Sequence, residues 1–201
     1  MIELRNKIYI GSENRQSLYD LTVPDNPKAL VLFAHGYKGY KDWGAWRVVE
    51  NDFVNAGFGF LKFNMSHNGG TVKEPIDFPD LDAFGMNDYT KELFDLNRIT
   101  NLVTNFLKEK ELDIPIYLIG HSRGGGVAIL HTAKDKRIKK LVTWAAISDI
   151  ERRFPVGDEL EDWKYAGVRF VKNGRTNQMM PHFYAFYENF IANKEKKNGK
   201  L

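Results

Sequence analysis

Continuous apolar runs alternate with amphipathic segments over the first three quarters of the chain. The runs at 29–34 and 116–119 hold only aliphatic and aromatic residues, as expected for strands buried on both faces. Between them, apolar residues recur every three or four positions from 42 to 57 and from 91 to 110, which predicts two helices. Strands that alternate with helices predict an α/β fold with a doubly wound, mostly parallel sheet.

The beginning of the chain departs from this alternation. Residues 7–10 and 18–23 are short β-type runs with a polar connection between them, which predicts an N-terminal antiparallel hairpin. A strand at 58–65 leads into a long loop, 66–88, that is rich in Gly, Pro and Asp. A further strand, buried like the others, is predicted at 139–147.

The alternation stops in the last quarter of the chain. Residues 151–180 are mixed in composition, with a small hairpin predicted at 168–174, and a final helix is predicted at 183–194. We therefore predict a single domain over 1–193, in which 151–180 forms a lid-like segment. The basic tail, 194–201, is predicted to be disordered.

A glycine-flanked serine follows one of the buried strands and opens a helix of small residues. The segment reads Gly120-His121-Ser122-Arg123-Gly124 and matches the G-x-S-x-G pattern of a nucleophile elbow. A serine on so sharp a turn needs neighbours without side chains, which the two glycines provide. The helix that follows would direct free N–H groups and its positive dipole end at a reacting oxygen. The pattern thus predicts a nucleophilic serine.

The same glycines allow a second interpretation. Gly120, Gly124 and Gly126 also have the G-x-x-x-G-x-G spacing with which short-chain dehydrogenases bind dinucleotide phosphates. However, they lie beyond the middle of the chain, and no acidic residue ends the next strand, where a ribose would need one. The Tyr-x-x-x-Lys spacing occurs only upstream, at Tyr37 and Lys41. We favour the nucleophile over this dinucleotide site and over a purely structural turn.

Composition excludes several other classes of function. The net charge of +3 arises in the tail, since 194–200 holds four lysines and one glutamate, and the rest of the chain balances at 25 basic and 25 acidic residues. We therefore predict no nucleic-acid partner. The charged N-terminus and the absence of a long apolar run predict a cytoplasmic protein without a membrane segment. There is no cysteine, and no spacing of residues points to a metal or a cofactor, so neither is predicted.

Three segments together carry a family resemblance. They are Ala-His-Gly-Tyr-Lys-Gly at 34–39, Phe-Asn-Met-Ser-His-Asn-Gly at 63–69, and Gly-His-Ser-Arg-Gly-Gly at 120–125. With the strand order, they make the chain similar to the α/β-hydrolase superfamily, and most similar to bacterial single-domain esterases and prolyl-oligopeptidase-like serine hydrolases. The resemblance covers residues 7–193.

The resemblance implies a role for three residues. Ser122 would be the nucleophile, and the backbone N–H groups of Tyr37 and Arg123 would form the oxyanion hole. The implied chemistry is acyl transfer on a small-molecule ester or similar acyl substrate: the serine attacks a carbonyl carbon, and water later releases the acid.

The family places an acid and a histidine on strands that follow the lid segment, and this chain stops before them. We therefore predict a sheet that is C-terminally incomplete. Among the residues present, His182 or His67 could serve as the base, although surface or packing roles are also open. Asp149, at the end of a predicted strand, is the best-placed acid, but the pattern favours a turn or helix-cap residue over an acid at this position.

Two functions follow from this pattern. The first is a serine hydrolase of the esterase type. The second is a non-catalytic module with the same fold that binds a small ligand or a partner chain in the same cleft. An incomplete sheet would leave the strand at 139–147 at an edge, and exposed edges recruit pairing partners, so a homodimer formed through this edge is predicted.

Overall fold

A computed structural model of the chain describes residues 1–198. Within them, six strands form one sheet in the order β1-β2-β4-β3-β5-β6, and β7 pairs with β8 in a separate hairpin. The strands are β1 (Ile2–Ile10), β2 (Gln16–Val23), β3 (Leu30–Ala34), β4 (Gly59–Phe63), β5 (Ile116–His121), β6 (Ile138–Trp144), β7 (Val168–Lys172) and β8 (Met179–Phe183). The helices are α1 (Trp46–Asn55), α2 (Leu81–Gly85), α3 (Tyr89–Glu109), α4 (Arg123–Lys134), α5 (Asp158–Ala166) and α6 (Ala185–Asn198), with short 3-10 turns η1 (Ser12–Asn14) and η2 (Glu151–Arg153).

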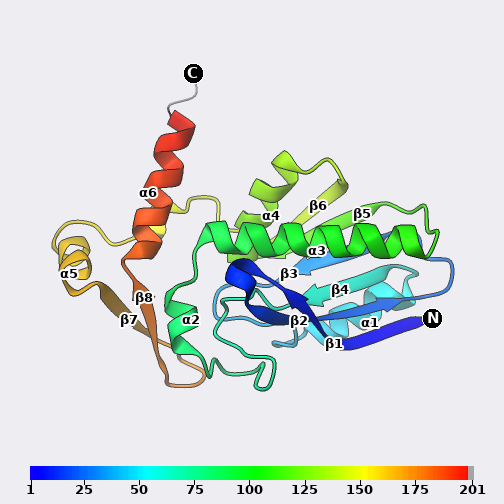
Figure 1. Ribbon diagram of the computed structural model, residues 1–201, viewed down its shortest axis with the longest axis horizontal. Helices are drawn as coiled ribbons and strands as arrows, with labels where there is room; N and C mark the ends of the chain where they lie inside the picture. The colour runs from blue at the N-terminus through cyan, green and yellow to red at the C-terminus, as the bar shows by residue number, and fades with distance from the viewer. Residues whose placement is uncertain (199–201) are drawn as a thin grey trace.

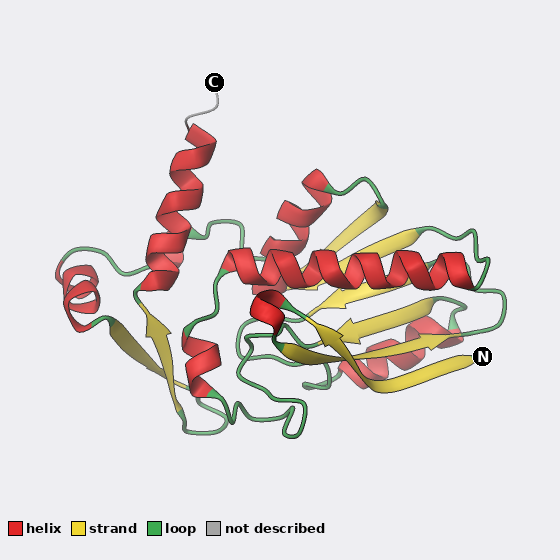
Figure 2. Cartoon of the chain, viewed as in Figure 1, coloured by secondary structure: helices red, strands yellow, loops and turns green. Residues whose placement is uncertain are grey.

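The sheet is mostly parallel, as predicted. β3 runs parallel to β4 and β5, and β5 runs parallel to β6. β1 and β2 form the expected antiparallel hairpin at the other side, where β2 pairs antiparallel with β4. The arrowheads of β3 and β4 in Figure 2 point toward the end of the molecule where β7, β8, α5 and α6 gather.

Helices cover both faces of the sheet, because successive side chains of a buried strand point to opposite faces. Leu30 and Leu32 of β3 belong to the cluster that includes apolar residues of α3 and α4. Val31 and Phe33 belong to a second cluster, which α1 covers. Figure 1 shows α3 crossing the sheet on one side, with α1 on the other. The prediction of a doubly wound α/β fold is confirmed.

The strand predicted at 139–147 lies at an edge as expected, but it is shorter and more exposed than predicted. β6 ends at Trp144 and lies at the edge of the sheet, bonded only to β5 among the described strands. Most of its side chains are exposed, and Val142 is 47% exposed. The prediction that this strand is buried was wrong, since apolar content alone does not show whether a neighbouring strand and two layers of helix are present.

The segment at 151–180 is more regular than its mixed composition suggests. It contains η2, α5 and β7, and the predicted hairpin extends beyond it, because β8 ends at Phe183 and pairs with β7 across a turn at 173–178. The loop at 66–88 contains the short helix α2, whose N-terminus is capped by the Asp80 side chain bonding to the Ala83 N–H. These elements and α6 lie together at one end of the molecule (Figure 1).

The last helix begins and ends later than predicted. Phe183 closes β8, and α6 runs from Ala185 to Asn198, so the first five residues of the predicted tail are helical. The prediction of disorder for 199–201 falls outside the described residues. No helix in the described part of the chain combines the length and apolar character that crossing a bilayer requires.

A network of charges, buried except for Asp42, lies under α1, on the face of the sheet opposite α3. The Lys62 ammonium of β4 contacts the carboxylates of Asp20 at 3.3 Å and Glu50 at 3.2 Å, and hydrogen bonds to Asp42. The ammonium of Lys41 lies 2.8 Å from Asp20. Burial alone would lower the pKa of Lys62, but the bond to Asp42 and the surrounding carboxylates raise it. The network joins two strands, α1 and the loop after β3.

Candidate active site

Ser122 lies on a sharp turn between β5 and α4, as predicted. Its backbone has φ 52° and ψ −118°, a strained region for a residue with a side chain. The Ser122 N–H donates to the Trp144 carbonyl at 2.9 Å, and the Ser122 carbonyl accepts from Gly125 at 3.0 Å and Ile147 at 3.2 Å. Bonds to the chain around β6 thus hold the strained residue in place.

The two glycines of the G-x-S-x-G pattern sit where no side chain fits. A Cβ on Gly124 would come within 2.2 Å of the His35 carbonyl oxygen, and one on Gly120 within 2.6 Å of the Gly124 carbonyl oxygen. Because both obstacles are backbone atoms, they cannot rotate away. The glycines therefore let α4 begin directly against the ends of β3 and β5.

The loop after β3, residues 35–40, lies against the serine, and we call it the His-Gly loop. A Cβ on Gly36 would be 3.0 Å from the Ser122 Cβ. The buried His35 ring accepts from the Met65 N–H at 3.1 Å and donates from Nδ1 to the Gly36 carbonyl at 2.9 Å. Burial lowers the pKa of His35 to about 4, so the ring stays neutral and can both accept and donate.

The Arg123 side chain is buried and joins three helices, a role that the sequence analysis missed. Its Nε lies 2.9 and 3.0 Å from the two carboxylate oxygens of Glu92. Its guanidinium lies over the rings of Tyr89 at 4.4 Å and Phe186 at 4.7 Å. Burial would lower the pKa of Arg123, but the Glu92 carboxylate raises it. This contact packs α4 against α3 and α6.

His182, a predicted base, is 7% exposed and contacts the His-Gly loop. Its Nε2 and the Tyr37 hydroxyl are 2.7 Å apart. Burial, with the nearby charges of Arg123 and Arg169, lowers the pKa of His182 to about 3, whereas an efficient general base titrates nearer the working pH. Burial raises the pKa of Tyr37 to about 12, so both partners of this bond are neutral at physiological pH.

The other four histidines have partners of their own. His67 is bonded to Ser66 and Glu13, and His131 lies 3.1 Å from the Thr100 hydroxyl between α3 and α4. The His121 ring lies 5.0 Å from the ring of Trp46. The His35 ring bonds to the backbone groups of Gly36 and Met65. None of these described contacts reaches Ser122, and the role predicted for His67 stays a prediction.

Asp149, the predicted acid, lies in the exposed connection after β6. Its carboxylate accepts from the Arg152 N–H at 3.3 Å and lies 3.2 Å from the Arg152 Nε. These contacts tie Asp149 to the short turn η2, whose N-cap is Ile150. Its role as an acid stays a prediction that these contacts do not support.

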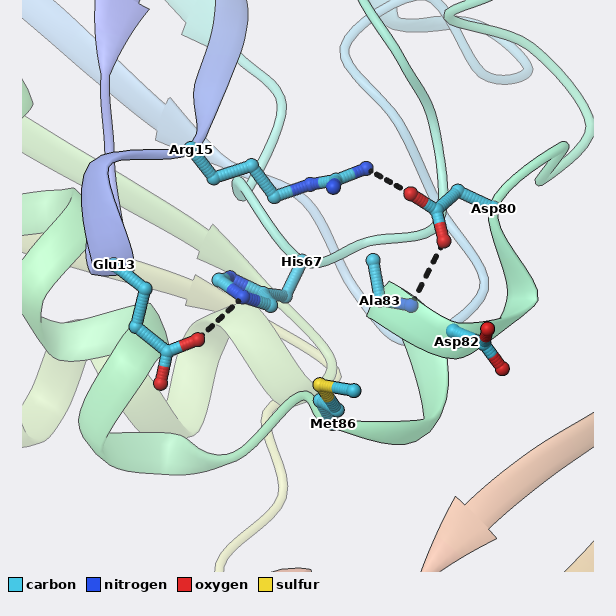
Figure 3. Close-up of a pocket in the computed structure, with 7 residues that line it drawn as sticks. All are labelled: Glu13, Arg15, His67, Asp80, Asp82, Ala83 and Met86. Carbon is cyan, nitrogen blue, oxygen red and sulfur yellow. Dashed lines mark hydrogen bonds and ion pairs between the residues drawn. The ribbon is translucent and has the colours of Figure 1, made fainter.

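A separate open pocket of about 410 Å³ lies beside the β1–β2 turn and α2 (Figure 3). Its lining includes ion pairs that join Arg15 to Asp80 at 2.7 Å and His67 to Glu13 at 3.1 Å. Neither Ser122 nor the His-Gly loop lines it. Because its charged groups already bond to one another, it offers few free groups to a ligand.

Three solved structures illustrate which known proteins share the fold of this chain. A putative hydrolase from Agrobacterium vitis S4 has a TM-score of 0.68 at 16% identity, over 96% of this chain and 72% of that protein. A soluble variant of monoglyceride lipase from Saccharomyces cerevisiae, in complex with a substrate analog, has a TM-score of 0.68 at 15% identity. The match covers 100% of this chain and 71% of that protein. Est1E from Butyrivibrio proteoclasticus, with ferulic acid bound, has a TM-score of 0.66 at 21% identity. The match covers 91% of this chain and 70% of that protein.

The chain therefore spans about seven tenths of the length of each of these three proteins. A search of curated proteins found no match. The profile of one protein family, described as serine aminopeptidase, S33, matches residues 25–196, which include both the His-Gly loop and the serine turn. By this match and by its fold, the chain belongs to the serine aminopeptidase S33 family of the α/β-hydrolase superfamily.

Proposed function

We propose that the chain is a serine hydrolase that acts on carboxylic esters or similar acyl substrates, with Ser122 as the nucleophile. The observation that carries this proposal is the strained conformation of Ser122, φ 52°, at the junction of β5 and α4. Strain of this kind persists only where the surrounding structure fixes it, and it is concentrated at functional sites. The family match supports the same assignment.

Two backbone N–H groups would stabilise the negative charge that develops on the substrate oxygen. Arg123 is the first residue of α4, where N–H groups have no partner within the helix and the helix dipole is positive. The second group is the N–H of Tyr37, in the loop that contacts Ser122 through Gly36. Removing one such donor typically costs about 100-fold to 1000-fold in rate.

In the proposed reaction, the Ser122 oxygen attacks the carbonyl carbon while its proton passes to a base. The tetrahedral intermediate collapses, the C–O bond to the alcohol breaks, and the alcohol leaves with a proton. Water then attacks the acyl-serine ester and releases the carboxylic acid and the serine hydroxyl. His182 and Asp149 stay the predicted base and acid, but their described contacts, with Tyr37 and Arg152, support structural roles better.

The choice of esters as substrates is supported by the structural neighbours. One of them is a monoglyceride lipase and another has ferulic acid bound. We propose uncharged acyl esters as the first substrates to test. The side chains of Tyr37 and His182 are both neutral, and they lie at the His-Gly loop, which carries one N–H group of the proposed oxyanion hole. A cytoplasmic location stays a prediction.

We expect Ser122→Ala to lower kcat/KM for p-nitrophenyl esters by at least about 1000-fold, because the nucleophile is lost. The measurement is steady-state hydrolysis of a series of acyl chain lengths. Ser148→Ala is the matched control, since Ser148 is exposed beyond β6, and it should leave the rate unchanged. A Ser122→Ala protein that hydrolyses esters at the wild-type rate would exclude Ser122 as the nucleophile.

A non-catalytic binding module is the second candidate, and the free edge of β6 favours it. We propose that two copies pair through β6, which is exposed and bonded on one side only among the described strands. Sedimentation velocity should show a fraction of dimer that grows with protein concentration. Val142→Lys, which adds charge at the edge, should shift the protein to monomer. A wild-type monomer at the highest soluble concentration would contradict this pairing.

A further inference from the structure

The side chains of the His-Gly loop are bonded to the β7–β8 hairpin, far away in the sequence. The Tyr37 hydroxyl bonds to His182 of β8, and the Lys38 ammonium donates to the Lys172 carbonyl of β7 at 2.9 Å. From the turn of the hairpin, Arg175 donates to the Tyr40 hydroxyl at 3.1 Å. The hairpin therefore contacts the loop at three residues, Tyr37, Lys38 and Tyr40.

His182 is the buried partner of the Tyr37 contact, at 7% exposed, whereas Tyr37 itself is 39% exposed. The His182 ring packs edge-on against Phe84 at 5.7 Å and stacked against Phe186 at 6.3 Å. The Trp163 indole N–H donates to the His182 carbonyl at 2.7 Å, which fixes the backbone of β8 against α5. A ring held on this many sides gives the Tyr37 hydroxyl a fixed partner.

We propose that His182 is a positioning residue: through its bond to the Tyr37 side chain, it holds the Tyr37 backbone N–H at the distance from Ser122 that an oxyanion hole requires. The inference rests on the proposed function, because it assigns His182 to the same site. It also gives the β7–β8 hairpin a role in the proposed site.

The geometry of the loop explains why a side-chain anchor matters. On one side, Gly36 already lies against Ser122, and the His35 ring holds its carbonyl. On the other side, Lys38 has φ 53°, a left-handed conformation that its own side chain disfavours. Tyr37 stands between these two points. Without its anchor, the peptide that carries the proposed donor could rotate, and a shift of about 1 Å can cost about 100-fold in rate.

The test compares four variants by steady-state ester hydrolysis. We expect His182→Ala to lower kcat by about 10-fold to 100-fold with KM nearly unchanged, since the donor acts on the transition state. His182→Gln, which retains a polar group that can bond to the hydroxyl, should recover most of the rate. Tyr37→Phe should resemble His182→Ala, and the double variant should lose no more than either single one.

A control separates positioning from loss of stability. His131→Ala also removes a buried histidine and its hydrogen bond, but between α3 and α4, so it should lower stability and leave kcat unchanged. Hydrogen exchange of the Gly39 and Lys41 amides, which bond to the Gly36 carbonyl and Asn64, gives a second readout without catalysis. It should become at least about 10-fold faster in His182→Ala.

The two proposals fail in different ways. A wild-type chain that hydrolyses no ester would contradict the proposed function, while faster exchange at Gly39 and Lys41 in His182→Ala would still support the positioning role. A wild-type chain that hydrolyses esters, with kcat retained in His182→Ala, would overturn the positioning role alone. Unchanged exchange at both amides would overturn it as well, whether or not the chain is active.

Discussion

Replacing Gly124 by alanine is expected to destabilise the protein by about 2–3 kcal/mol and to lower ester hydrolysis by at least about 100-fold. The added Cβ would lie 2.2 Å from the His35 carbonyl oxygen and 2.5 Å from that of Ala34. Neither oxygen can move without shifting the end of β3 or the start of α4. Either shift displaces Ser122 relative to the His-Gly loop, so stability and activity should fall together.

Gly174→Ala is the matched control for this prediction. Nothing lies within 4 Å of a Cβ added at Gly174, in the turn of the hairpin, so its free energy of unfolding should stay within about 0.5 kcal/mol of wild type. Both variants are measured by urea unfolding and by p-nitrophenyl ester hydrolysis. A Gly124→Ala protein of wild-type stability and activity would show that the close approach of α4 to β3 is not needed.

The second large effect is expected at Lys62. Lys62→Met keeps most of the apolar stem but removes the charge from a side chain that is 1% exposed. It leaves the buried carboxylates of Glu50 and Asp20 without one of their cations, and breaking a buried ion pair typically costs about 3–5 kcal/mol. We expect a loss of this size in the free energy of unfolding, measured by urea denaturation at neutral pH.

The control and the double variant separate charge from packing. Lys7→Met, on the exposed part of β1, should change stability by no more than about 0.5 kcal/mol. Lys62→Met combined with Glu50→Gln removes both charges of one pair and should be less destabilising than the sum of the two single changes. Additive losses would mean that the network contributes through packing and not through its charges.

Much of the fold could be predicted from local patterns. The buried strands were visible as apolar runs, and the serine turn was visible because Gly120 and Gly124 occupy positions that no other residue can fill. The His-Gly loop could be placed next to the serine because the carboxyl ends of parallel strands share one edge of a sheet. Such features depend on residues close in sequence or on the general rules of sheets.

The rest depends on contacts between distant residues. Tyr37 and His182 are 145 positions apart, and no periodicity in either segment predicts that they meet. The Arg123 side chain and Glu92 come from different helices, so only the packing of α3 against α4 shows the pair. The exposure of β6 likewise follows from what lies beside it. Some signals were present but weak, such as Asp80 as the cap of α2 and Gly157 before α5.

The measurement that tests the central proposal most directly is the intact mass of the protein after incubation with a fluorophosphonate probe. The probe phosphonylates a serine only when a nearby base and an oxyanion hole activate it. We expect one adduct on the wild-type chain and none on Ser122→Ala, with Ser148→Ala labelled like wild type. A wild-type chain that takes up no probe, or a Ser122→Ala chain that is still labelled, would contradict the assignment of Ser122 as an activated nucleophile.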